Sequence, residues 1–80
     1  MDIKTVYAKL NEVFRDVFDD DSITVGPKTT AKDIEDWDSL EHITLMTAVQ
    51  KKFKVKFTMG EISSMKNVGE MADIIAKRAK

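Results

Sequence analysis

The residues best suited to chemistry lie within one short stretch, Trp37–Ile43, which contains a serine, a histidine and two acids. An acid followed by a serine and an apolar run at helical spacing predicts a helix that begins at Ser39. Asp38 is then the N-cap, whose carboxylate accepts a backbone N–H. Glu41, at the third helical position, is expected to reach back and form a capping-box-like pair with Asp38. Such a helix start favours a phosphate near the Ser39 hydroxyl, because free N–H groups and the helix dipole both attract negative charge.

Ser39 and His42 lie three residues apart, so on one helix their side chains are neighbours and nucleophilic catalysis has to be weighed. The pair lacks an orienting acid, a set of oxyanion donors and the Gly-x-Ser-x-Gly turn that would support it. We therefore expect His42 to be a surface residue, and we expect no catalytic residue in this chain.

The composition argues against a metal site. With no cysteine and one histidine, the chain lacks the ligands of a structural zinc. Asp19 and Asp21 have the first spacing of an EF-hand calcium loop. The pattern then fails, since Thr24 stands where the turn glycine belongs and Thr30 where the bidentate glutamate belongs. We interpret this segment as an acidic, solvated loop.

The charge is unevenly distributed along the chain. Residues 1–41 hold eleven acids and five bases, whereas residues 42–80 hold three acids and eight bases. The basic residues are spread over two segments without interleaved aromatic residues, so a nucleic-acid partner is not expected. Neither a signal sequence nor a run of transmembrane length is present. We expect a single domain over residues 1–80, cytoplasmic and without membrane insertion.

Apolar residues recur at steps of three and four in two long segments. The first predicts a helix over residues 3–18, and the second predicts a helix from Ser39 to about Phe53. The core-facing residues expected on the second helix are Leu45, Met46, Val49 and Phe53. Between them runs a long connection, in which residues 30–33 are expected to form a helical turn. Trp37 is expected to pack over the edge of the core.

The end of the chain predicts two further helices. Lys52–Phe57 alternates with period two, but a lone strand would have no partner, so we expect an extended segment that inserts Val55 and Phe57 into the core. Thr58 and Glu61 form a capping-box pattern that opens a short helix ending near Ser64, and Asn67 with Glu70 repeats the pattern before the last helix. Its expected buried residues are Val68, Met71, Ile74 and Ile75. The fold class is therefore all-α, a four-helix bundle with a long first loop and a short third helix.

Asp38-Ser39-Leu40 resembles the attachment motif of acyl carrier proteins, and the order of elements matches that family over nearly the whole chain. The resemblance implies that Ser39 carries 4′-phosphopantetheine through a phosphodiester, and that Asp38 caps the helix and assists the phosphopantetheinyl transferase through its metal ion. It also implies a carrier without catalytic activity. Its partners would then be enzymes that load and transfer acyl groups in fatty-acid, lipid or polyketide-type biosynthesis.

Around Ser39 we expect a surface that partner enzymes bind. Leu40, Ile43 and Thr47 fall on one strip beside the serine, with Glu41 and Thr44 at its margin. Apolar residues there would anchor a small, transient interface on a monomeric carrier. The alternative is that Leu40 and Ile43 simply widen the core-facing stripe.

The sequence departs from ordinary fatty-acid carriers, which resemble one another in an acidic second helix. Here Thr44, Gln50, Lys51 and Lys52 occupy that region, and Trp37 precedes the motif as in a subset of the family. We therefore expect a specialised carrier with dedicated partners. Two alternatives remain open: a peptidyl or aminoacyl carrier, and a helical interaction module whose serine stays unmodified.

Overall fold

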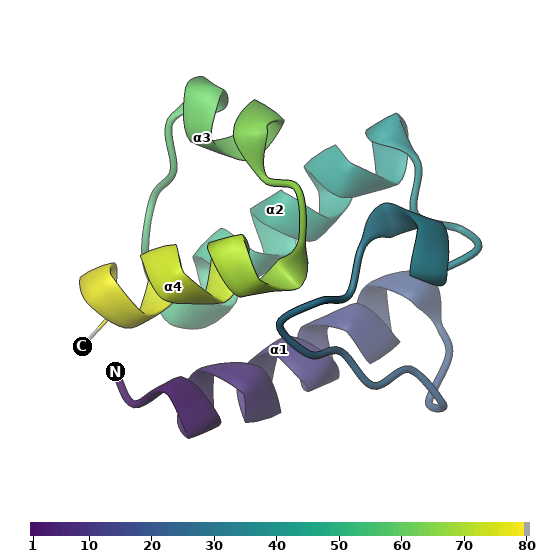
Figure 1. The fold of residues 1–80 in the computed structure, drawn as a ribbon, viewed down its shortest axis with the longest axis horizontal. Coiled ribbons are helices and arrows are strands. Elements are labelled where there is room, and N and C mark those ends of the chain that lie inside the picture. Colours follow the sequence, from purple (N-terminus) through teal and green to yellow (C-terminus); the bar gives the residue numbers. More distant parts are fainter. Residues whose placement is uncertain (80) are drawn as a thin grey trace.

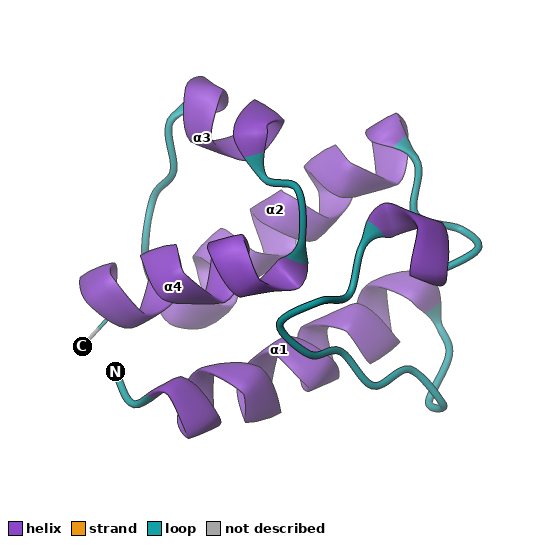
Figure 2. Ribbon diagram, in the orientation of Figure 1, coloured by secondary structure: helices purple, strands orange, loops and turns teal. Residues whose placement is uncertain are grey.

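The computed structural model describes residues 1–79 and consists of helices joined by loops (Figures 1 and 2). No strand occurs among these residues, so the expected all-α class is confirmed. The elements in chain order are α1 (Ile3–Phe18), the 3₁₀ turn η1 (Ala31–Asp33), α2 (Ser39–Phe53), α3 (Met59–Ser64) and α4 (Val68–Arg78). The predicted bounds of the first two helices and the end of the third are confirmed.

The core lies where α1 packs against α2 and α4. Every core residue predicted on α2 is buried, and Leu45 and Val49 are fully enclosed. On α4, three of the four predicted residues are buried, but Ile74 is only half-buried, and the small side chain of Ala72 is enclosed instead. The predicted core-facing sides of α2 and α4 are therefore right, except that Ala72, and not Ile74, is buried on α4.

The long first loop is attached to the core and to α4. Val25 is buried and Trp37 packs edge-on against Phe14, with ring centroids 5.3 Å apart, so the predicted role of Trp37 in core packing is confirmed. The expected turn is η1, in which Thr30 forms a capping box with Asp33. Just before η1 in the chain, two carbonyls of the loop accept hydrogen bonds from the first N–H groups of α4. The N–H of Val68 donates to Thr29 at 2.8 Å, and that of Gly69 donates to Pro27 at 3.1 Å.

The segment between α2 and α3 is extended, as expected. Val55 is buried and Phe57 is half-buried. The chain leaves α2 through Lys54, which has a left-handed backbone (φ 56°) and donates its N–H to the carbonyl of Gln50. This turn closes the helix and directs the following residues back toward the core.

The capping predictions for the last two helices differ in outcome. Thr58 and Glu61 form the complete capping box expected at α3. At α4, Asn67 accepts the N–H of Glu70 at 2.9 Å as predicted, but the Glu70 carboxylate accepts the N–H of Lys66 and not that of Asn67. The predicted box at α4 is therefore half right.

Candidate functional site

Ser39 is the first residue of α2 and is exposed. The preceding residue holds the helix start in place: the Asp38 side chain accepts the N–H of Glu41 at 2.8 Å, and the Asp38 carbonyl accepts the N–H of His42 at 2.9 Å. The N–H groups of Ser39 and Leu40 find no acceptor among residues 1–79, as is usual in a first helical turn. The helix start thus presents a hydroxyl and free N–H donors to solvent.

The predicted hydrogen bond between the Glu41 carboxylate and the backbone N–H of Asp38 is wrong. Instead, the Asp38 N–H donates to the carbonyl of Asp36 at 3.1 Å. The turn at residues 35–36 thus supplies the acceptor from the backbone, and α2 begins with a cap but without a capping box. Glu41 is half-buried, at the margin of the site.

His42 is not the surface residue that the sequence suggested. Its ring is half-buried and lies stacked near Trp37, with centroids 5.9 Å apart. Nδ1 accepts a hydrogen bond from Trp37 Nε1 at 3.1 Å, and Nε2 lies 3.0 Å from the carbonyl oxygen of Ile62. Because both ring nitrogens are engaged, His42 has no free nitrogen to act as a base toward Ser39.

A pocket of about 470 Å³ opens beside Ser39, between α2, α3 and the start of α4. Its walls are mainly apolar, with polar groups at Ser39 and at the end of α3. The lining residues include Trp37, His42, Ile62, Met65, Asn67 and Met71. A volume of this size is in the range of sites that hold small organic groups.

The strip expected to bind partners lies largely in solvent. The side chains of Leu40 and Ile43 are 74% and 58% exposed, and Thr44 and Thr47 are exposed as well. The alternative that Leu40 and Ile43 widen the core is therefore wrong. The Thr47 hydroxyl donates to the carbonyl of Ile43 at 3.0 Å, so this threonine is turned back onto its own helix.

Met59 was not predicted from the sequence to be part of this surface. It is 70% exposed at the start of α3 and lines the same pocket as Ile43. The signal was available, since a capping box at Thr58 places Met59 at the first helical position, where a side chain has little of its own helix to pack against. Met59 therefore extends the apolar surface from α2 onto α3.

Within residues 1–79, no cluster of three histidine, cysteine, aspartate or glutamate residues is arranged to hold a metal ion. Over the same residues, none of the helices has the length and apolar character needed to cross a membrane.

Comparisons with known proteins agree with this geometry. Residues 8–75 match the model of a family described as the phosphopantetheine attachment site. Among solved structures, the chain is similar to the solution structure of the holo acyl carrier protein from Geobacter metallireducens. The two share 44% identity with a TM-score of 0.85, over 91% of this chain and 84% of that protein. A search of curated proteins found no match.

Proposed function

Because the chain belongs to the phosphopantetheine-binding family and is a carrier similar to acyl carrier proteins, we propose that Ser39 is its attachment residue. Phosphopantetheine supplies a flexible arm that ends in a thiol, on which acyl groups are carried as thioesters. The family is one of carriers and not of catalysts, so modifying and acyl-handling enzymes perform the chemistry.

The observation that carries the proposal is the position of Ser39. Its hydroxyl is exposed at the start of α2, directly after a cap that the Asp38 carboxylate makes to the Glu41 N–H. A phosphodiester on this oxygen would lie beside the unpaired N–H groups of the first turn, where the helix dipole favours negative charge. An arm that starts here would also have the pocket beside Ser39 within immediate reach.

We assign Asp38 two roles. As the N-cap it fixes the direction of the first turn and therefore of the Ser39 hydroxyl. As an exposed carboxylate next to the modified oxygen, it is also suited to bind the metal ion of a phosphopantetheinyl transferase. We place this loading reaction in the cytoplasm, where the donor coenzyme A is available.

The docking surface we propose consists of Leu40, Ile43 and Thr47 on α2, with Glu41 and Thr44 at its edge. A partner must bring its active site to an arm on Ser39, so it has to cover the residues around that serine. Exposed apolar side chains there would anchor a short-lived interface, and the polar margin would set its orientation. Thr44, Gln50, Lys51 and Lys52 occupy the region of the second helix that is acidic in ordinary fatty-acid carriers. We therefore propose a specialised carrier with dedicated partners. It would be monomeric and formed by one domain over residues 1–80.

The test is to incubate the unmodified protein with coenzyme A and a broad-specificity phosphopantetheinyl transferase, and then to measure intact mass and map the adduct. We expect one phosphopantetheine per chain, on Ser39, and none on Ser39→Ala. The matched control is Ser63→Ala, because Ser63 is also exposed and lines the same pocket. An adduct on Ser63 or Ser64, or none with several transferases, would refute the assignment.

The cargo is a separate question, answered by protein isolated from its host. A fatty or polyketide-type acyl thioester on the arm would favour an acyl carrier of lipid or polyketide-type biosynthesis, whereas an amino acid would identify an aminoacyl or peptidyl carrier. A chain that leaves its host without any arm would favour an interaction module with an unmodified serine.

A further inference from the structure

The short helix α3 has no buried side chain. Ile62 and Met65 pack against the core but remain half-buried. A six-residue helix with so little buried apolar surface is expected to lie at the low end of local stability. Polar contacts to the neighbouring helices therefore contribute a large part of what keeps α3 in place, and through α3 they affect the pocket beside Ser39.

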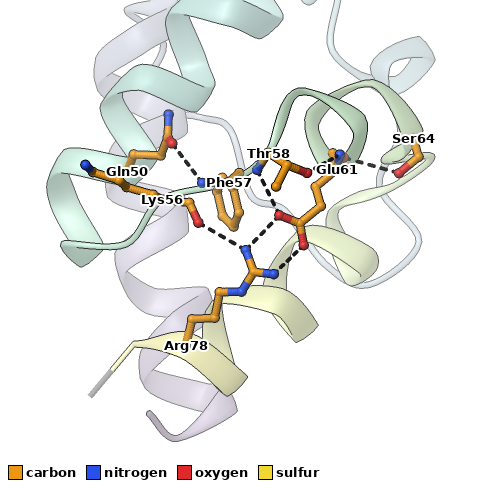
Figure 3. A network of polar contacts seen from close by, with 7 residues as sticks. All are labelled: Gln50, Lys56, Phe57, Thr58, Glu61, Ser64 and Arg78. Atoms are coloured by element: carbon orange, nitrogen blue, oxygen red, sulfur yellow. Dashed lines mark hydrogen bonds and ion pairs between the residues drawn. The ribbon is translucent and has the colours of Figure 1, made fainter.

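One set of these contacts comes from α4, as Figure 3 shows. Arg78 binds both carboxylate oxygens of Glu61, at 2.7 and 2.5 Å, and also donates to the carbonyl of Lys56 at 3.0 Å. This ion pair fixes the side of α3 that faces the end of α4. A different residue contacts the side of α3 that faces α2 and the pocket.

That residue is His42. The indole N–H of Trp37 can only donate, so the Nδ1 atom that accepts it carries no proton. The neutral imidazole must then carry its proton on Nε2, which donates to the carbonyl of Ile62 at 3.0 Å. The two hydrogen bonds define one tautomer and one ring orientation. They form a bridge from a buried tryptophan, through α2, to the backbone of α3.

We propose that His42, oriented by Trp37, is the positioning residue that ties α3 to α2 and thereby sets the width of the pocket beside Ser39. Both His42 and Ile62 line that pocket, so the Nε2 contact spans its wall. The inference concerns the unmodified chain. Only the statement that this pocket lies within reach of an arm on Ser39 rests on the proposed carrier function.

The bridge depends on the charge of His42. A protonated imidazole donates from both nitrogens, so Nδ1 would face the indole N–H as a second donor and the Trp37 bond would be lost. Other charged groups nearby are Asp38 and Lys66, which line the pocket, and Glu41, which adjoins His42; on α3, Glu61 is paired with Arg78. Among residues 1–79, no hydrogen bond joins any of these groups to the ring.

The experiment measures amide-exchange protection of Ile62 and Ser63 by NMR on unmodified protein, with Ile75 of α4 as the internal reference. His42→Phe keeps an aromatic ring but removes both hydrogen bonds, and we expect it to lower protection in α3 by about fivefold to tenfold. His42→Gln keeps one acceptor and one donor without a titrating group, and we expect it to lose less than about twofold. Equal protection in His42→Phe and the wild type would overturn the proposal, as would equal losses in His42→Phe and His42→Gln.

A second arm needs no substitution. The chain has one tryptophan and one histidine, so the indole N–H and both imidazole nitrogens give unambiguous signals. At neutral pH we expect the Nε2–H tautomer. A proton on Nδ1 at neutral pH would refute the bridge. None of these outcomes bears on the loading of Ser39.

Discussion

Ile43 and Leu45 lie two residues apart on α2 and occupy opposite environments: the side chain of Ile43 is 58% exposed, and that of Leu45 is fully buried. Two residues along a helix correspond to a rotation of about 200°, so the pair marks its two sides. One side belongs to the core with α1. The other lies beside Ser39 and belongs to the proposed docking surface.

The first prediction compares Ile43→Asp with Leu45→Asp. A charge at position 43 remains in water, so the protein should fold normally but lose acyl transfer from its partner enzyme. The same charge at position 45 would be buried without a partner, and the protein should unfold. Circular dichroism and a transfer assay on the loaded carrier measure the two effects. Normal transfer by a folded Ile43→Asp protein would remove Ile43 from the docking surface.

The second prediction concerns stability and uses two leucines of one helix. Leu45→Ala should lower the free energy of unfolding by about 2–5 kcal/mol, because it leaves a cavity in the core. Leu40→Ala, at a side chain that is 74% exposed, should change it by less than about 0.5 kcal/mol. Urea denaturation gives both values. Similar losses in the two variants would mean that the faces of α2 are misassigned.

The third prediction concerns Gly69, at the start of α4. A Cβ at this position would lie 2.6 Å from the carbonyl oxygen of Pro27, an oxygen that also accepts the Gly69 N–H. Since the obstacle is backbone, Gly69→Ala should cost about 1–3 kcal/mol of stability. Gly60→Ala is the control, because a Cβ there meets only the Thr58 hydroxyl at 3.9 Å. An alanine at 69 that is tolerated as well as one at 60 would argue against the close approach.

The fourth prediction is a pH dependence. Hydrogen bonds from Arg78, together with the backbone N–H of Thr58, lower the pKa of Glu61 from 4.5 to about 2. A lowered pKa in the folded state means that the ionised form stabilises the fold, fully above pH 4.5 and progressively less as the pH falls toward 2. The difference in urea midpoint between wild type and Glu61→Gln should therefore shrink over this interval. A difference that stays constant with pH would contradict the prediction.

The fifth prediction separates attachment from folding. Ser39→Ala should accept no phosphopantetheine yet keep the thermal midpoint of the wild type within a few degrees, because the Ser39 hydroxyl is exposed and forms no hydrogen bond within residues 1–79. Asp38→Ala is the comparison, since it removes the acceptor for the Glu41 N–H and should cost about 1 kcal/mol. A large loss of stability in Ser39→Ala would indicate a structural role for the serine.

Most of the fold was predictable because its helices are defined locally. The bounds of α1 and α2 follow from apolar periodicity, and the start of α3 follows from Thr58 and Glu61. The position of Ser39 at a helix start needed only the acid before it and the apolar pattern after it. These signals act within one or two helical turns, so a sequence displays them directly.

What could not be predicted depends on contacts between distant segments. His42 looked like a surface residue because nothing near it in the sequence reveals that the carbonyl of Ile62 lies 3.0 Å away. The predicted hydrogen bond from the Asp38 N–H to the Glu41 carboxylate was wrong because a turn in the preceding loop offers that N–H a backbone acceptor at Asp36. The pairing of Glu61 with Arg78 likewise joins residues seventeen positions apart.

The backbone hydrogen bonds from Val68 and Gly69 to the first loop also bear on proteolysis. Exposed loops are the usual sites of protease nicking, and Lys28 is an exposed basic residue in such a loop. Its two neighbours, Pro27 and Thr29, provide the carbonyls that the start of α4 binds, so this stretch cannot extend into a protease active site without releasing that helix. Trypsin should therefore cut after Lys28 only when the start of α4 releases the loop, and the rate of that cut reports on how often this local contact opens.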